Sequence, residues 1–209
     1  MPPLYPGPAY RIVTQRTVIR CWNPADAPLM KTAVEENLDH LRPWMPWAEG
    51  DPPDLQERIN LLRSFRGRFD LGEDFVYGIF NRDETRVLGG TGLHTRAGKD
   101  AREIGYWVHK EFINQGYATE ISAALTRVAF EVDEVRRVEI QMAVENARSA
   151  AIPRKLGFTY EATLRQREVL EDGRFHDLQV WTLLILDYHA SPCAQADIQA
   201  YDAMGRRIL

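Results

Sequence analysis

Residues 103–120 read EIGYWVHKEFINQGYATE, and the prediction of both the fold and the ligand site starts from this stretch. An apolar strand runs into a loop, and residues 114–119 (NQGYAT) then open an amphipathic helix. Gly116 can adopt a positive φ and lets the main chain approach a ligand closely. The free N–H groups at the positive end of the helix dipole then form an anion site that suits a pyrophosphate. An ordinary loop-to-helix turn with a glycine is the alternative, and the motif by itself favours neither.

The rest of the chain surrounds this stretch with further strand and helix patterns. Their order combines an antiparallel meander with one or two parallel crossovers, whereas a doubly wound fold would alternate more regularly. We therefore predict an α/β (α+β) fold with a single domain, in which helices flank a mixed, mostly antiparallel sheet. The expected ranges are strand 11–21, helix 29–38, loop 41–54, helix 54–65, strands 75–80, 86–93 and 104–108, helix 116–132, strand 137–144, helix 147–156, and a closing strand pair 158–169 and 175–186 around the turn Asp172-Gly173.

Length and composition set the broad class. A chain of 209 residues fits one domain with a sizeable core. We expect an irregular N-terminal arm over residues 1–9, a domain over residues 10–188 and a polar C-terminal extension over residues 189–209. The sequence has no apolar run of about eighteen residues, and its start lacks the features of a secretory signal, which favours a cytoplasmic protein that does not enter a membrane. A formal net charge of −4 argues against nucleic-acid binding through a broad basic face.

Several other function classes lack their motifs. Cys21 and Cys193 form no CxxC pair, so we expect free thiols in a reducing compartment. The histidines show no metal-ligand spacing such as HExxH, and no metal is expected. Neither GxSxG nor GxxxxGK occurs, which disfavours a serine hydrolase or a P-loop enzyme. The glycine-rich residues 89–92 (GGTG) lack GxGxxG spacing and lie in a strand, so close strand packing explains them best.

A second pattern, Asn146-x-x-Ser149 followed by residues 156–158 (LGF), comes directly after the next strand. As isolated residues they are explained more simply by helix capping. Together with residues 40–48 (HLRPWMPWA), 103–108 (EIGYWV) and 115–120 (QGYATE), however, they resemble the GNAT acetyltransferases. The closest likeness is to the Rim-type branch, which acetylates ribosomal-protein N-termini. The likeness covers roughly residues 10–188 and implies a GNAT fold, whose sheet splays to admit the pantetheine arm of acetyl-CoA.

Two positions depart from the family pattern. Ile113 stands where the phosphate motif usually begins with Arg or Gln. Because the cradle is mostly main chain, we expect cofactor binding to survive this change. Pro153 lies inside the short helix, where a proline costs about 3 kcal/mol in a regular interior. We expect it to distort the helix that carries Ser149.

The resemblance implies direct acetyl transfer from acetyl-CoA to a primary amine in a ternary complex, without a metal. It places Ser149 as donor to the leaving thiolate and Glu168 as general base, although Glu168 could equally be a solvated strand carboxylate. A main-chain N–H near Val108 would stabilise the oxyanion. The residues expected to bind the cofactor are Trp107, Val108, Asn114, Gln115, Gly116, Tyr117, Ala118, Thr119, Asn146 and Ser149.

The likeness favours a protein N-terminal amine as acceptor, and it makes a homodimer possible. By analogy with the family, Trp44, Trp47 and Tyr77 are expected to line the acceptor side, although core packing is the simpler explanation for Tyr77. A small amine, such as a polyamine, an amino acid or an antibiotic, is the alternative with the same chemistry. A non-catalytic acyl-CoA-binding module and a structural protein without a ligand are the alternatives from other classes.

Overall fold

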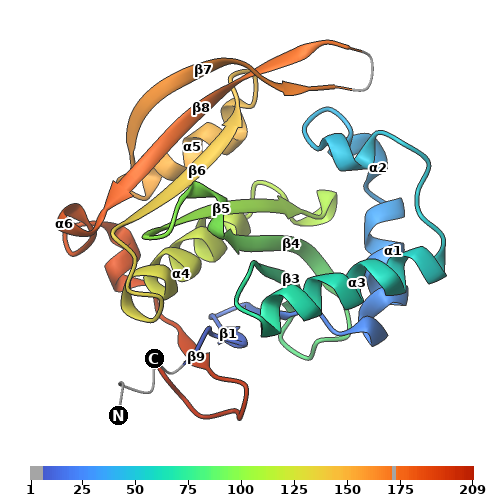
Figure 1. The fold of residues 1–209 in the computed structure, drawn as a ribbon, viewed down its shortest axis with the longest axis horizontal. Coiled ribbons are helices and arrows are strands. Elements are labelled where there is room, and N and C mark those ends of the chain that lie inside the picture. Colours follow the sequence, from blue (N-terminus) through green and yellow to red (C-terminus); the bar gives the residue numbers. More distant parts are fainter. Residues whose placement is uncertain (1–6, 171–172) are drawn as a thin grey trace.

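The computed structural model describes residues 7–170 and 173–209 (Figure 1). Within these residues nine strands form one sheet in the order β7-β8-β6-β5-β4-β3-β2-β1-β9. β5 and β6 run parallel, and the other neighbouring strands run antiparallel. The predicted single domain with a mixed, mostly antiparallel sheet is confirmed. The strands are β1 (Arg11–Val13), β2 (Thr17–Cys21), β3 (Phe75–Asn81), β4 (Val87–His94), β5 (Ala101–Val108), β6 (Arg137–Ala143), β7 (Thr159–Val169), β8 (Phe175–Leu184) and β9 (Gln199–Tyr201).

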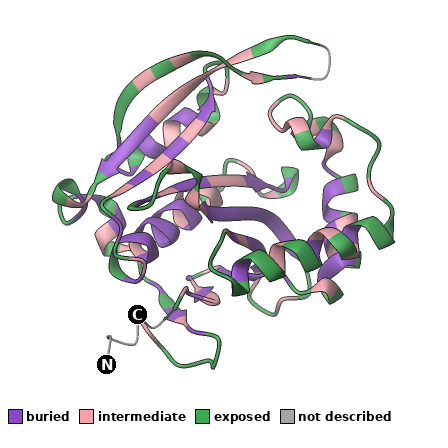
Figure 2. Ribbon diagram, viewed as in Figure 1, coloured by how far each residue is buried: buried purple, intermediate pink, exposed green. Residues whose placement is uncertain are grey.

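Helices flank both faces of the sheet (Figures 1 and 2). α4 packs through Ile121, Leu125 and Val128 into the main core, which it shares with α5, β5 and β6. α1 and α3 bury Val34 and Leu62 in a second cluster on the opposite face. The helices are α1 (Ala27–Glu35), α2 (Leu38–Leu41), α3 (Leu55–Asp70), α4 (Tyr117–Glu131), α5 (Ala147–Lys155) and α6 (Ile185–Tyr188), with 3-10 turns at Pro24–Asp26, Pro46–Ala48, Thr95–Ala97, Lys110–Phe112 and Pro192–Gln195.

The parallel pair β5 and β6 separates partway along its length. The two strands pair from Ala101 with Arg137 to Ile104 with Ile140, and the pairing ends there. Residues 105–108 of β5 continue to pair with β4, whereas residues 141–143 of β6 continue to pair with β8. The sheet is therefore open between the second halves of β5 and β6, as the resemblance implied.

The first expected strand is in fact two strands. Residues 11–21 form the hairpin of β1 and β2, whose turn is closed by Thr14. The Thr14 hydroxyl accepts the N–H of Thr17 at 3.0 Å, and the Thr14 N–H donates to the Thr17 carbonyl at 3.0 Å. A threonine can close such a turn through its side chain, without the glycine or proline that usually reveals one in a sequence.

The chain after residue 188 also contributes to the sheet. β9 adds an edge strand beside β1, with Ile12 opposite Ala200, and both of these side chains are buried. The polar composition of residues 189–209 gave no sign of this strand. Residues 1–6 of the expected N-terminal arm and Asp172 of the expected turn lie outside the described residues.

Candidate functional site

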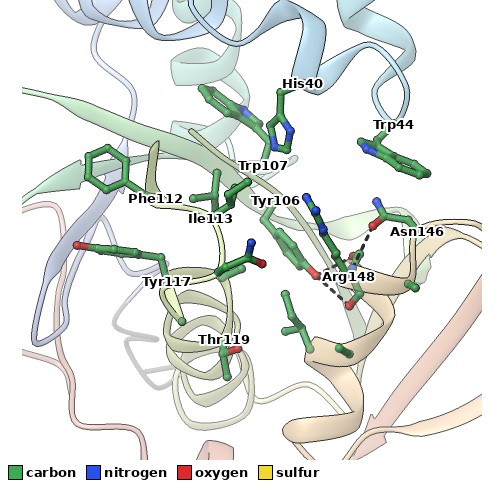
Figure 3. Close-up of a pocket in the computed structure, with 18 of the residues that line it drawn as sticks. His40, Trp44, Tyr106, Trp107, Phe112, Ile113, Tyr117, Thr119, Asn146 and Arg148 are labelled. Atoms are coloured by element: carbon green, nitrogen blue, oxygen red, sulfur yellow. Dashed lines mark hydrogen bonds between the residues drawn. The ribbon is translucent and has the colours of Figure 1, made fainter. Parts of the chain in front are cut away.

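A cavity of about 570 Å³ lies at the opening between β5 and β6 (Figure 3). Its walls come from four parts of the chain that are far apart in sequence. The lining residues used below are His40, Trp44 and Met45 from α2 and the loop after it, Tyr106, Trp107 and Val108 from β5, Ile113, Asn114, Gly116, Tyr117, Ala118 and Thr119 from the loop and first turn of α4, and Asn146, Arg148, Ser149 and Ile152 from α5 and its N-cap.

The first turn of α4 faces this cavity without a capping side chain. Gly116 is the N-cap residue, with φ +84°, and no side chain accepts a hydrogen bond from the first N–H groups of the helix. Asn114 also has positive φ, at 58°. The turn therefore offers unpaired main-chain donors at the positive end of a 15-residue helix, an arrangement that binds phosphate groups.

Two features of this cradle were not evident in the sequence. Gln115 lies outside the cavity lining, and its side-chain amide donates to the Glu111 carbonyl at 2.6 Å. Arg16, in the turn between β1 and β2, donates to the Gln115 carbonyl at 2.9 Å and stacks over the Tyr117 ring at 4.0 Å. A cation from a distant turn thus stands beside the loop that has Ile113 in place of a basic or amide residue.

Ser149 forms a hydrogen-bonded pair with Tyr106. Asn146 caps α5 by accepting the Ser149 N–H at 3.0 Å, as predicted. The Ser149 hydroxyl lies 2.8 Å from the Tyr106 hydroxyl. Burial raises the pKa of Tyr106 to about 12, so the phenol keeps its proton near neutral pH and can donate to Ser149. Tyr106 belongs to the EIGYWV motif, but the sequence did not predict it as a site residue, because an aromatic residue in a strand usually packs in the core.

Pro153 frees a main-chain carbonyl of α5 that Tyr106 approaches. α5 continues through Pro153, which has no N–H to offer to the carbonyl of Ser149, four residues earlier. The Tyr106 hydroxyl instead lies 3.4 Å from that carbonyl. The proline therefore leaves an acceptor free at the position where Tyr106 approaches α5.

Val108 directs its N–H toward the opening. The next residue, His109, donates its N–H to the Leu88 carbonyl on β4 at 2.8 Å. Successive N–H groups of a strand point to opposite sides, so the Val108 N–H points away from β4 and toward the side from which β6 has departed. This donor has the orientation that an oxyanion site at Val108 requires.

The segment between α1 and α2 is tied to the residues after β5. Buried His109 lies 3.1 Å from a carboxylate oxygen of Glu36, and the Lys110 N–H donates to the Asn37 side chain at 2.6 Å. These bonds hold the segment that brings Trp44 to the cavity wall. Trp47 is 51% exposed, and its ring packs at a tilt against Trp107, with centroids 6.3 Å apart.

Tyr77 and Glu168 lie away from the cavity lining. Tyr77 is only 1% exposed, donates to the Ala9 carbonyl at 3.0 Å and packs edge-on against Phe69, so the structure places it in the core. Glu168 lies on β7, opposite His176 of β8, with a carboxylate oxygen 3.6 Å from the ring nitrogen Nδ1. The structure therefore brings Ser149, Val108 and the α4 cradle together, but it does not place Glu168 beside Ser149.

Residues 7–170 and 173–209 contain no group of three His, Cys, Asp or Glu side chains suited to a metal ion. Among the helices in those ranges, none has the length and apolar character needed to cross a membrane.

The chain is similar in sequence to known acetyltransferases. A family model described as an acetyltransferase (GNAT) domain matches residues 16–159. YdaF of Bacillus subtilis (strain 168), whose name describes a ribosomal N-acetyltransferase, is 30% identical over 173 residues, which cover 82% of this chain and 93% of that protein. The ribosomal-protein-serine acetyltransferase of Escherichia coli (strain K12) is 26% identical over 166 residues, which cover 73% of this chain and 90% of that protein.

Solved structures show the same fold. RimL, a ribosomal L7/L12 alpha-N-protein acetyltransferase in complex with coenzyme A, matches with a TM-score of 0.74 and 23% identity, over 83% of this chain and 96% of that chain. The microcin C7 self-immunity acetyltransferase MccE, in complex with acetyl-CoA and AMP, matches with a TM-score of 0.75 and 18% identity, over 82% of this chain and 94% of that chain.

Proposed function

The chain belongs to the acetyltransferase (GNAT) family, and on that premise we propose that its acceptor is the free α-amine of a protein N-terminus. Transfer of an acetyl group from acetyl-CoA to a primary amine follows from the family. The observation that carries the choice of acceptor is the likeness to two relatives over nearly their whole lengths, which includes the loop 40–48. Both of these relatives, matched over 93% and 90% of their lengths, have names that describe ribosomal acetyltransferases.

The cavity residues fit the binding of acetyl-CoA, which supplies an activated acetyl thioester. The free N–H groups of the α4 turn are suited to the pyrophosphate, and the edge of β5 is suited to the pantetheine arm. In this proposal the Val108 N–H stabilises the carbonyl oxygen as it gains charge. The Ser149 hydroxyl, backed by Tyr106, donates to the sulfur that leaves as thiolate.

Glu168 is proposed as a general base for the acceptor ammonium. An α-amine has a pKa near 7.7–8.0, so about a tenth of it is already neutral at pH 7, whereas a lysine amine is neutral to only about one part in a thousand. An N-terminal acceptor therefore needs less help with deprotonation than a lysine acceptor does. We expect Glu168→Gln to lower kcat/KM about tenfold at pH 7, since general-base contributions begin at this size or above.

A thiol-release assay with acetyl-CoA tests the proposed acceptor. Three acceptor groups are compared: short peptides with free Ser, Ala or Met N-termini, polyamines, and aminoglycosides. Turnover confined to peptides is the expected result. Turnover confined to polyamines or aminoglycosides would overturn the acceptor while leaving the reaction class in place. A homodimer in solution stays a prediction, which light scattering of the purified protein checks.

A further inference from the structure

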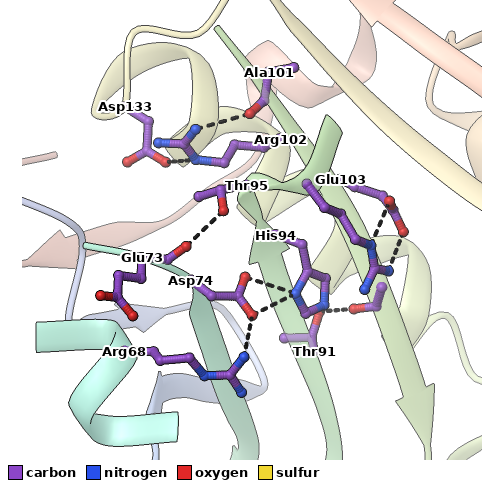
Figure 4. Close-up of polar contacts among 12 residues, drawn as sticks. Arg68, Glu73, Asp74, Thr91, His94, Thr95, Ala101, Arg102, Glu103 and Asp133 are labelled. Atoms are coloured by element: carbon purple, nitrogen blue, oxygen red, sulfur yellow. Dashed lines mark hydrogen bonds and ion pairs between the residues drawn. The ribbon is translucent and has the colours of Figure 1, made fainter. Parts of the chain in front are cut away.

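A histidine and an aspartate lie together at the end of β4 (Figure 4). The preceding residue, Leu93, packs in the core that α4 covers, so His94 lies on the opposite face of the sheet. His94 Nδ1 is 3.0 and 3.2 Å from the two carboxylate oxygens of Asp74, which precedes β3. Burial by itself would raise the pKa of Asp74, but its hydrogen bond and charge interaction with His94 lower it below the ordinary value, with help from Arg68 and Arg96. The carboxylate is therefore ionised near neutral pH.

This contact determines which ring nitrogen of His94 can accept a proton. An ionised carboxylate can only accept hydrogen bonds, so Nδ1 carries the hydrogen that points to Asp74. In the neutral ring Nε2 then keeps its lone pair and can accept a proton. Asp74 also balances the positive charge that the ring acquires on protonation. The pair is thus built to accept a proton at Nε2.

Nε2 lies beside the open half of β5. In the register of β4 and β5, Gly92 is opposite Gly105, and His94 is opposite Glu103. A Cβ added at Gly92 would lie 2.6 Å from Nε2, and one added at Gly105 would lie 3.3 Å from it. The ring therefore covers both glycines, on the face where Trp107 also projects, because residues 105 and 107 alternate together along the strand. Gly105 and the cavity-lining Trp107 are about 7 Å apart along β5.

Carboxylates surround this position. Arg96 pairs with both oxygens of Glu103, and this hydrogen bonding raises the pKa of Arg96. The charges of Asp74 and Glu168 raise it further, so these carboxylates share the neighbourhood of one guanidinium. Asp74, in the loop before β3, contacts His94, and Arg68 of α3 pairs with Asp74. Arg96, in the 3-10 turn after β4, pairs with Glu103 of β5, and the charge of Glu168, which contacts His176 on the β7–β8 hairpin, also acts on Arg96.

His40, the histidine in the cavity wall, has the opposite surroundings. Burial lowers the pKa of His40, and the charges of Arg148, His109 and Lys110 lower it further. The charges that act on His40 are those of cations, whereas a carboxylate contacts His94 directly. His94 is therefore better suited than His40 to hold a proton taken from an ammonium.

We infer that His94, oriented by Asp74, accepts a proton from the acceptor ammonium, as a second proton acceptor beside Glu168. The inference rests on the proposed function, because it requires an amine acceptor that is protonated in solution. Nε2 takes one proton, and the nitrogen lone pair so released forms the C–N bond to the thioester carbon. The C–S bond breaks, its electron pair stays on sulfur, and the remaining excess proton on nitrogen passes through Glu168 and water to the thiolate. The imidazolium returns its proton to water, so the products are the amide, the CoA thiol and one proton.

The test measures kcat/KM for a peptide with a free N-terminal Ser, from pH 6.5 to 9, in the wild type, His94→Gln, Asp74→Asn and the exposed control His189→Gln. We expect His94→Gln to lower kcat/KM about 100-fold at pH 6.5, where most of the acceptor is ammonium. The loss should shrink to about threefold at pH 9, where most of the amine is already neutral. Asp74→Asn should change the pH profile in the same direction, and His189→Gln should match the wild type.

Affinity for CoA, measured by calorimetry, shows whether each variant is folded, and it is expected to stay within about twofold of the wild type. A loss in His94→Gln that is equal at every pH would overturn the inference in favour of a structural role, as would unchanged rates. If the wild type acetylates a polyamine but no peptide, the acceptor proposal fails, and the same pH series with the polyamine still decides the role of His94. Should His94→Gln fail to fold, Asp74→Asn decides by the same criterion.

Discussion

The proposed cofactor side and the proposed acceptor side of the site are constructed differently. The proposed cofactor side is centred on one short segment, residues 113–119, in which positive φ angles and main-chain N–H groups make the cradle. The proposed acceptor side combines the loop after α2, which lines the cavity, with side chains at the end of β4 and on the β7–β8 hairpin, which lie outside the cavity lining. Substitutions on the cofactor side should therefore change the affinity for CoA, and those on the acceptor side should change rate and pH dependence.

The largest effect is expected for Gly116→Val, which changes the main-chain conformation of the cradle itself. A β-branched residue at φ +84° is strained by about 1–3 kcal/mol, and its side chain would also project beside the N–H groups. We expect the affinity for CoA, measured by calorimetry, to fall about 100-fold. Gly205→Val is the matched control, because Gly205 has φ +72° in the C-terminal loop and an added Cβ meets nothing within 4 Å. Equal CoA affinity in both variants would mean that Gly116 has no special role in the cradle.

A second prediction separates chemistry from binding at the point where the two sides meet. Ser149→Ala should lower kcat about tenfold, because a thiolate with a pKa near 8.5 leaves tolerably well with little help. Tyr106→Phe should cause a similar loss, and the double variant should be little worse than either single one, since the two hydroxyls act as one unit. The affinity for CoA should hardly change. A folded Ser149→Ala protein with undiminished kcat would remove Ser149 from the mechanism.

The same contrast explains what could be predicted from the sequence. The strand–loop–helix at residues 103–120 and the Asn146 cap are local patterns, and both are present where expected. The turn at Thr14 was missed because a side-chain hydrogen bond closes it. The edge strand β9 was missed because it forms only by pairing with β1, which is far away in sequence. No local pattern reports such features.

Site prediction failed for groups that depend on register or on long-range contacts. Tyr106 could be assigned to the site only from the tertiary structure, in which α5 places Ser149 against it. His94 and Asp74 are separated by 20 residues and meet through the pairing of β3 with β4. Both Tyr77 and Trp44 were expected on the acceptor side by analogy, with core packing the simpler explanation for Tyr77. The tertiary fold shows that Tyr77 is buried in the core and that Trp44 lines the cavity.

A smaller effect is expected on the cofactor side from Arg16→Gln. Arg16 is partly neutralised by Glu120, whose carboxylate is 2.6 Å from Arg16 Nε, so its contribution to binding a phosphate should be modest. We expect the affinity for CoA to fall about fourfold at low salt, and less at high salt because exposed charges are screened. Arg207→Gln, on the C-terminal segment, serves as the control for charge alone. A loss of the same size in Arg207→Gln would attribute the effect to net charge.

The smallest effect concerns stability on the acceptor side. The folded-state pKa of Asp74 is lowered, so its stabilising contribution is complete above the unfolded pKa, near 3.9, and is lost as the pH falls through the folded value. Asp74→Asn should therefore lower Tm by about 2–4 °C at pH 6, and the difference from the wild type should shrink below about pH 4. Thermal melts at several pH values check this. A constant difference in Tm down to pH 2 would show that the charge of Asp74 is not its source.

The central claim, acetylation of a protein N-terminal amine, is tested most directly with two peptides of one sequence. Both contain an internal lysine, and one has a free N-terminal Ser while the other is blocked at its N-terminus. The account predicts thiol release only with the free peptide and, by mass spectrometry, an acetyl group on its first residue. Acetylation of the internal lysine in both peptides would contradict this claim. So would release of the CoA thiol at equal rates with both peptides.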